Sequence, residues 1–201
     1  MDLTPRQSEF ADAALRVLAA GGMASVTFRS VAAEAGMSPG AVQKAFPSKD
    51  VMQHAMFHRM RERASAPAMG EPGRPDLRRW LVDLMMVVLP LDDARRAAEL
   101  QASGFAERAA YDSSIGGAIA ASDRELTARI ALLVRRGMAE GEVADVDPDM
   151  VARAWFALGE GLSTQLLYDP RPEDDVRAFV GFVVDRLLGP DPRGTGFEMI
   201  R

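Results

Sequence analysis

Apolar residues recur along the chain at intervals of three and four, the spacing that places side chains on one face of an α-helix. Near the N-terminus such a stripe comprises Phe10, Ala13, Ala14, Val17 and Leu18. No segment shows the strict alternation of apolar and polar residues that is typical of a half-buried strand. Glycine and proline are concentrated between the periodic segments, where they end helices. The pattern predicts an all-α protein of about nine helices.

Capping residues predict where several of these helices begin. Thr4 and Gln7 form the pattern of a capping box, and Pro5 stands at the first helical position, where a missing amide costs nothing. Gly21 and Gly22 are expected to stop this first helix. Outside the segment that follows it, the predicted helices cover Pro5–Ala19, Lys49–Ala64, Asp76–Leu89, Asp92–Ala110, Ser113–Ala139, Pro148–Tyr168 and Glu173–Leu188.

The segment Thr27–Lys49 carries the most specific pattern in the chain. Thr27 is placed to cap a short helix, and Gly36 is placed to end it in the left-handed conformation that glycine tolerates. Ser38 then caps a second helix that begins with Pro39. Two helices around such a turn form a helix-turn-helix, whose second helix enters the DNA major groove. The alternative is an ordinary helical hairpin within a bundle.

Composition places the chain among globular proteins without disulfides. It has 201 residues, of which 48% are hydrophobic, and it has no cysteine, which removes disulfides and thiolate metal sites. The sequence shows no targeting leader and no apolar run approaching the ~20 residues of a membrane span. We therefore expect a soluble, cytoplasmic protein that does not enter a membrane.

The charge distribution reconciles a DNA-binding segment with a net charge of −5. Up to Arg63 the chain carries 8 basic and 6 acidic residues, whereas the remainder carries 16 basic and 23 acidic residues. The acidity thus belongs to the part that follows the motif. A mildly basic head on an acidic body is consistent with a DNA reader attached to a different module.

The clearest break in the pattern is the segment Ala66–Pro75, which is rich in proline and glycine. We expect the boundary between functions near it. Residues 1–48 are predicted to form a three-helix DNA-binding head. Residues 49–201 are predicted to form a helical ligand-binding and dimerisation domain, joined to the head by the fourth helix.

The motif resembles the DNA-binding head of the TetR family of transcriptional repressors. The matching residues are Thr27, Val31-Ala32, Ala35-Gly36-Met37-Ser38, Gly40 and Phe46-Pro47-Ser48-Lys49. The later segments Leu89–Arg96 and Gly161-Leu162, before a Tyr-Asp-Pro stop, resemble the choline-repressor-like branch of that family. The resemblance implies phosphate contacts from Thr27, Arg29 and Lys49, with Lys49 at a helix N-terminus that already favours an anion.

The second helix of the motif supplies the candidates for reading bases. Besides the Ser38 cap, the candidates are Pro39, Gly40, Ala41, Gln43 and Lys44. The amide of Gln43 is suited to adenine, because it donates and accepts at once. The alternative for Gln43 is a solvated surface residue. The family often carries Tyr at this position and an aromatic residue or His where Ala45 stands, so the operator sequence is not expected to be inherited.

The resemblance also implies a pocket for a small-molecule effector between the later helices. The predicted lining residues are Trp80, Met85, Phe105, Tyr111 and Trp155. Aromatic and methionine side chains line such pockets, but they equally fill an ordinary core.

No constellation of residues indicates catalysis, a cofactor or a metal. His54 and His58 are four apart on one predicted helix, but no third ligand is apparent. The carboxylate clusters fall at helix starts, where the helix dipole accounts for them. We therefore expect a protein that is not an enzyme.

The last two predicted helices carry apolar stripes with Gly159, Gly161 and Gly181, which allow close helix packing. Two copies are expected to form a homodimer about a two-fold axis, although the stripes could also serve only the monomer core. A two-fold dimer implies a palindromic double-stranded DNA operator. The sequence thus predicts a sequence-specific transcriptional repressor that a small molecule releases from its operator. The alternative is a helical ligand-binding or dimerisation protein whose head no longer binds DNA.

Overall fold

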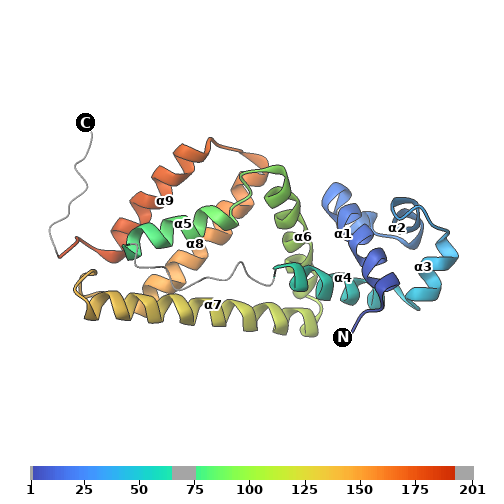
Figure 1. Cartoon of the computed structure of the whole chain (residues 1–201), viewed down its shortest axis with the longest axis horizontal. Coiled ribbons are helices and arrows are strands. Elements are labelled where there is room, and N and C mark those ends of the chain that lie inside the picture. The colour runs from blue at the N-terminus through green and yellow to red at the C-terminus, as the bar shows by residue number, and fades with distance from the viewer. Residues whose placement is uncertain (1, 65–75, 193–201) are drawn as a thin grey trace. The chain divides into compact units, whose positions relative to one another are not determined.

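The structure is a computed structural model that describes residues 2–64 and 76–192. Within these residues it contains nine α-helices and no strand (Figure 1). The predicted all-α fold is therefore confirmed. The helices are α1 (Pro5–Ser25), α2 (Phe28–Glu34), α3 (Pro39–Ala45), α4 (Lys49–Ala64), α5 (Leu77–Val88), α6 (Asp93–Ala109), α7 (Ser113–Ala139), α8 (Pro148–Tyr168) and α9 (Glu173–Leu188).

The first helix continues further than its sequence pattern predicts. Helix α1 reaches Ser25 instead of ending at Ala19. Gly22 interrupts it with φ 74° and ψ 175°, a backbone conformation that glycine adopts without strain. The glycine pair therefore does break the helix, but Gly21 remains helical and a short turn follows the break.

The chain divides into two compact units. Unit 1 comprises Met1–Met69 and Arg96–Ile119, and unit 2 comprises Gly70–Arg95 and Ala120–Arg201. Helices α1 to α4 thus share a unit with most of α6 and the start of α7. The predicted functional boundary between residues 48 and 49 stays a prediction, and the predicted break at Ala66–Pro75 lies outside the described residues.

Unit 1 is built around one cluster of buried side chains that includes Phe10, Leu18, Val42, Phe46 and Met56. Helix α1 packs against both α2 and α4. Helices α2 and α3 depend on this packing, because helices of only seven residues are marginal alone. The cluster therefore determines how the helix-turn-helix is held.

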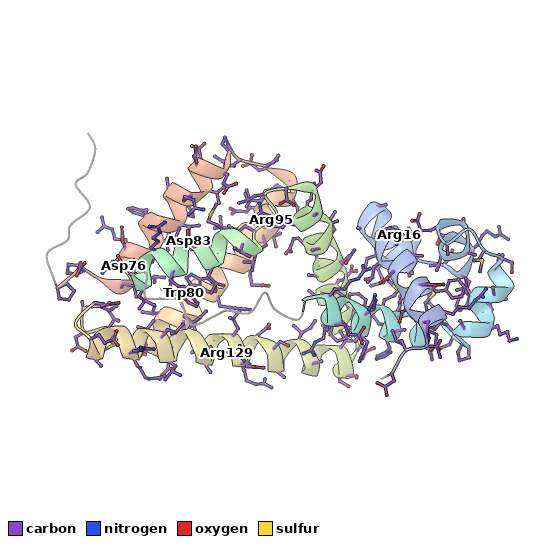
Figure 2. All side chains as sticks on the ribbon, viewed as in Figure 1. Arg16, Asp76, Trp80, Asp83, Arg95 and Arg129 are labelled. Atoms are coloured by element: carbon purple, nitrogen blue, oxygen red, sulfur yellow. The ribbon has the colours of Figure 1, made fainter. Side chains whose placement is uncertain are left out.

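Unit 2 has its own cluster, to which α5, α7, α8 and α9 contribute. The indole N–H of Trp155 donates to the carbonyl of Leu81 over 3.2 Å, so its only polar group is paired inside this core. Arg177 on α9 donates to Asp83 on α5 over 2.6 Å, and Figure 2 shows Asp83 on that helix. None of the described helices is both long and apolar enough to cross a membrane.

Adjacent glycines at the start of α7 offer a test of the packing in unit 1. A Cβ atom at Gly116 would lie 2.8 Å from the Ala109 carbonyl oxygen, whereas a Cβ atom at Gly117 would meet nothing within 4 Å. Gly116→Ala should therefore lower the free energy of unfolding by about 1–3 kcal/mol through overpacking. The matched variant Gly117→Ala should raise it by about 0.5–1 kcal/mol, because alanine favours the helix. Urea denaturation of both variants checks this, and equal effects would contradict the geometry.

Candidate nucleic-acid interface

Local hydrogen bonds cap the starts of α2 and α3 and close the turn between these helices. The hydroxyl of Thr27 accepts from the amide of Ser30 over 3.1 Å, and the amide of Thr27 donates to the hydroxyl of Ser30 over 2.9 Å. Gly36 has a φ of 65°, and the amide of Met37 donates back to the carbonyl of Ala32 over 2.8 Å. The hydroxyl of Ser38 accepts from the amide of Ala41 over 3.3 Å. The predicted helix-turn-helix and its caps are confirmed.

Helix α3 presents nearly all of its predicted base-reading residues to solvent. Val42 is its one buried residue, at 0% exposure, and it joins the core of unit 1. Ala41 is half-buried, and the remaining candidates are exposed: Ser38, Pro39, Gly40, Gln43 and Lys44. A helix with one buried side chain and a polar face in water is able to contact a groove without first being uncovered.

The predicted phosphate-contacting residues lie at helix starts on the same unit. Thr27 is the N-cap of α2, and Arg29 follows in its first turn. Lys49 is the first residue of α4, where the hydroxyl of Ser48 accepts from the amide of Val51 over 3.2 Å. Helix N-termini attract anions through their amides and dipole, so these positions suit phosphate groups.

Arginines that connect helices within unit 1 form ion pairs with acidic side chains. On α1 and α4, Arg16 pairs with Glu34 at 2.6 Å, while Arg59 and Arg63 both pair with Asp12 at 2.9 Å (Figure 2 shows Arg16 on α1).

Among the described residues, by contrast, no acidic partner lies within 4.0 Å of Arg29, Lys44 or Lys49. The positive charge of the motif therefore remains available to phosphates, although the whole chain carries a net charge of −5.

The sequence pattern did not predict a contact between Gln7 and the end of α3. The Nε2 atom of Gln7 on α1 donates to the carbonyl of Ala45 over 3.0 Å. The capping-box pattern of Thr4 and Gln7 indicated that Gln7 is held in place. It gave no sign of this partner, because the two residues are 38 positions apart.

The predicted pocket residues are distributed over both units. Met85 and Trp155 are buried in the core of unit 2, and Trp80 on α5 is half-buried beside them (Figure 2). Phe105 is buried in the core of unit 1, where its ring lies 5.2 Å from that of Phe57, and Tyr111 is 91% exposed. Their contact with an effector stays a prediction.

The two histidines lie beside carboxylates. His54 Nε2 is 3.2 Å from Asp112 Oδ2, and His58 Nδ1 is 3.3 Å from Glu62 Oε1. Hydrogen bonds from the backbone amides of Ile115 and Ser114 lower the pKa of the Asp112 carboxyl. Within the described ranges, no group of three or more His, Cys, Asp and Glu side chains is placed to hold a metal ion. The histidines line a pocket of about 530 Å³ in unit 1 with Phe57, Arg61, Glu62, Ser114 and Ala118.

Comparison with protein families assigns both parts of the chain. Residues 10–56 match the family of bacterial regulatory proteins described as tetR, and residues 77–189 match the C-terminal domain of BetI-type transcriptional repressors. The chain belongs to the TetR family. The predicted family and its choline-repressor-like branch are confirmed, and so is a DNA-binding transcriptional regulator. None of these matches favours the alternative of a head that has lost DNA binding.

Individual relatives resemble this TetR-family regulator over most of its length. The nicotine-responsive transcriptional repressor HdnoR of Paenarthrobacter nicotinovorans is 24% identical over 90% of this chain and 95% of its own. A transcriptional regulator of Saccharomonospora viridis, solved in complex with choline, has a TM-score of 0.78 at 23% identity, covering 89% of this chain and 95% of that one. A TetR-family regulator of Rhodococcus sp. has a TM-score of 0.76 at 22% identity, covering 92% and 100%.

Gly40 provides a test of the predicted DNA-binding residues. A Cβ atom there would meet nothing within 4 Å, so the fold itself does not require a glycine on α3. Gly40→Ala should therefore leave the protein as stable or raise its free energy of unfolding by up to about 1 kcal/mol. It should nevertheless weaken DNA binding, because glycine permits close approach of a backbone to a ligand. Thermal melting measures the stability, and fluorescence anisotropy with duplex DNA measures the affinity. An unchanged affinity would contradict the prediction that Gly40 lies against the DNA.

Proposed function

We propose that this TetR-family regulator is a homodimeric, cytoplasmic repressor that binds a palindromic operator and is released from it by a small-molecule effector. The observation that carries the proposal is the arrangement of α3, where Val42 is buried and Gln43 and Lys44 are exposed. Such an arrangement allows a helix to enter the major groove while its scaffold stays packed. The proposal includes no enzymatic activity, cofactor or metal.

In this proposal Gln43 is the principal base reader. Its amide is able to donate to and accept from one adenine, and such a bidentate pair is worth about 1–3 kcal/mol of discrimination. Lys44 would contact guanine or a phosphate, while Pro39 and Ala41 would contact a thymine methyl group. Ser38 and Gly40 would bring the backbone at the start of α3 close to the DNA.

Thr27, Arg29 and Lys49 would bind phosphates on either side of the groove. Contacts of this kind fix the register of a protein on DNA but carry no sequence information. The absence of acidic partners for Arg29 and Lys49 among the described residues supports this role.

Helices α8 and α9 would form the dimer interface. Phe179 and Phe182 on α9 are 47% and 57% exposed, and Tyr168 at the end of α8 is 73% exposed. Large apolar side chains exposed on two packed helices are costly in water and typical of an interface. A two-fold dimer would present its two α3 helices to half-sites about one helical turn apart or a multiple of that distance.

The effector would bind within unit 2, where Trp80, Met85 and Trp155 of the predicted lining residues contribute to one cluster. The nicotine-responsive relative and the choline complex of a structural neighbour suggest a small amine as the first class to screen. Aromatic rings attract such cations through their faces. Effector and DNA would then oppose each other through one coupling free energy, each lowering the affinity for the other by the same factor.

Selection of genomic DNA fragments by the purified protein, followed by footprinting, tests the central proposal. A palindromic protected sequence that a screened amine releases is the expected result. Intact dimers that bind no fragment more tightly than random DNA would contradict it.

Alanine substitutions should separate base reading from phosphate binding. Gln43→Ala should lose about 1–3 kcal/mol at one operator base pair and little elsewhere. Lys49→Ala should weaken all sequences about equally and reduce the salt slope by about 1. Anisotropy titrations over single-base operator variants and several salt concentrations measure both effects. A uniform loss for Gln43→Ala would remove it from the base-reading residues.

A charged residue on α9 should disrupt the dimer. Phe182→Glu would bury a carboxylate in the proposed interface, so it should produce monomers with intact helicity. The matched variant Leu132→Glu replaces an apolar residue on α7 that is 64% exposed and should leave the dimer unchanged. Sedimentation equilibrium gives the mass of each species. A dimer that survives Phe182→Glu would place the interface elsewhere.

A further inference from the structure

Gln7 joins the start of α1 to the end of α3 with both ends of its side-chain amide. Its Oε1 atom accepts from the amide of Thr4 over 3.0 Å and from the Thr4 hydroxyl over 3.1 Å. Its Nε2 atom donates to the carbonyl of Ala45 over 3.0 Å. One side chain thus completes the cap of the first helix and contacts the last residue of the recognition helix.

The partners themselves determine the orientation of this amide. A backbone N–H only donates and a backbone carbonyl only accepts, so the oxygen of Gln7 must face Thr4 and its nitrogen must face Ala45. A glutamate would complete the capping box equally well, but it has no N–H for Ala45. The bond to Ala45 therefore depends on glutamine, while the cap does not.

The carbonyl of Ala45 is one of the groups that a helix end leaves without an intrahelical partner. Helix α3 has only seven residues, and contacts from outside determine where its C-terminal end lies. The next residue, Phe46, is also held by α1, because its ring meets the ring of Phe10 edge-on at 6.5 Å. Helix α1 thus holds the end of α3 at two adjacent points.

We propose that Gln7 is a positioning residue for DNA sequence recognition, acting through its hydrogen bond to Ala45. The exposed residues Gln43 and Lys44 directly precede Ala45, so a displaced helix end moves them relative to base edges. Base contacts depend on such placement, because recognition groups must be held within about 0.5 Å of their productive geometry. Arg29 and Lys49 lie on α2 and α4, outside the helix whose end is held by the Ala45 bond, so we expect their phosphate contacts to change less than the base contacts. Loss of the bond should reduce discrimination between DNA sequences rather than general affinity.

The test measures the ratio of affinities for the selected operator and for a random duplex of the same length. Gln7→Met removes the amide without adding charge and should lower this ratio roughly 3- to 10-fold, as expected for one lost hydrogen bond. The control Thr4→Val removes only the hydroxyl of the cap and should leave the ratio unchanged. Gln7→Glu keeps the cap but lacks the N–H for Ala45, so it should lower the ratio as Gln7→Met does. Its added negative charge weakens binding to both duplexes alike and therefore cancels in the ratio.

Thermal melting followed by circular dichroism is the second readout. Gln7→Glu and Thr4→Val should both melt below the unsubstituted protein, because each loses a hydrogen bond, so a fall in the affinity ratio for Gln7→Glu alone would separate positioning from stability. An unchanged ratio for Gln7→Met and Gln7→Glu, or an equal fall for Thr4→Val, would overturn the proposal. The ratio does not depend on which residue of α3 reads the bases, so failure of Gln43 as the reader would leave this result interpretable.

Discussion

Recognition helix α3 depends on contacts at its two ends, because only Val42 among its seven residues is buried. At its start, the hydroxyl of Ser38 accepts a hydrogen bond from the amide of Ala41, and the chain enters the helix through the left-handed turn at Gly36. At its end, the neighbouring residues Ala45 and Phe46 are held by α1 through a hydrogen bond and a ring contact. Exposed side chains such as Gln43 and Lys44 contribute little to packing, so the helix depends on the contacts at its ends.

The charged residues of unit 1 fall into two groups, those with acidic partners and those without. Acidic residues neutralise the arginines that join helices, as Asp12 does for Arg59 and Arg63 and Glu34 does for Arg16. Hydrogen bonds to Asp12 and Glu62 raise the pKa of Arg59, because both carboxylates stabilise its charged form. Arg29, Lys44 and Lys49 of the motif have no acidic partner within 4.0 Å among the described residues. A protein with an acidic total charge is thereby able to present a basic surface locally.

Local features were predictable from residue types and spacing. The Thr27 and Ser38 caps, the Gly36 turn and the proline at the start of α3 depend on neighbours within four residues, so their chemistry is visible in the sequence. The end of α1 was predicted too early, because a glycine pair does not reveal which of its members leaves the helix. The 91% exposure of Tyr111 and the burial of Phe105 in unit 1 were not predictable, because an aromatic residue has the same helical spacing in either setting.

The sequence alone determined the helical fold, the helix-turn-helix and the family, because periodicity, capping and short motifs are properties of contiguous residues. The tertiary structure decided which residues of α3 are exposed to solvent and which side chains hold the helix in place. Gln7 shows the difference: its capping role follows from a partner three residues away, whereas its bond to Ala45 joins residues 38 positions apart. Only packing of α1 against the motif brings those two groups together, and no local pattern encodes that distance.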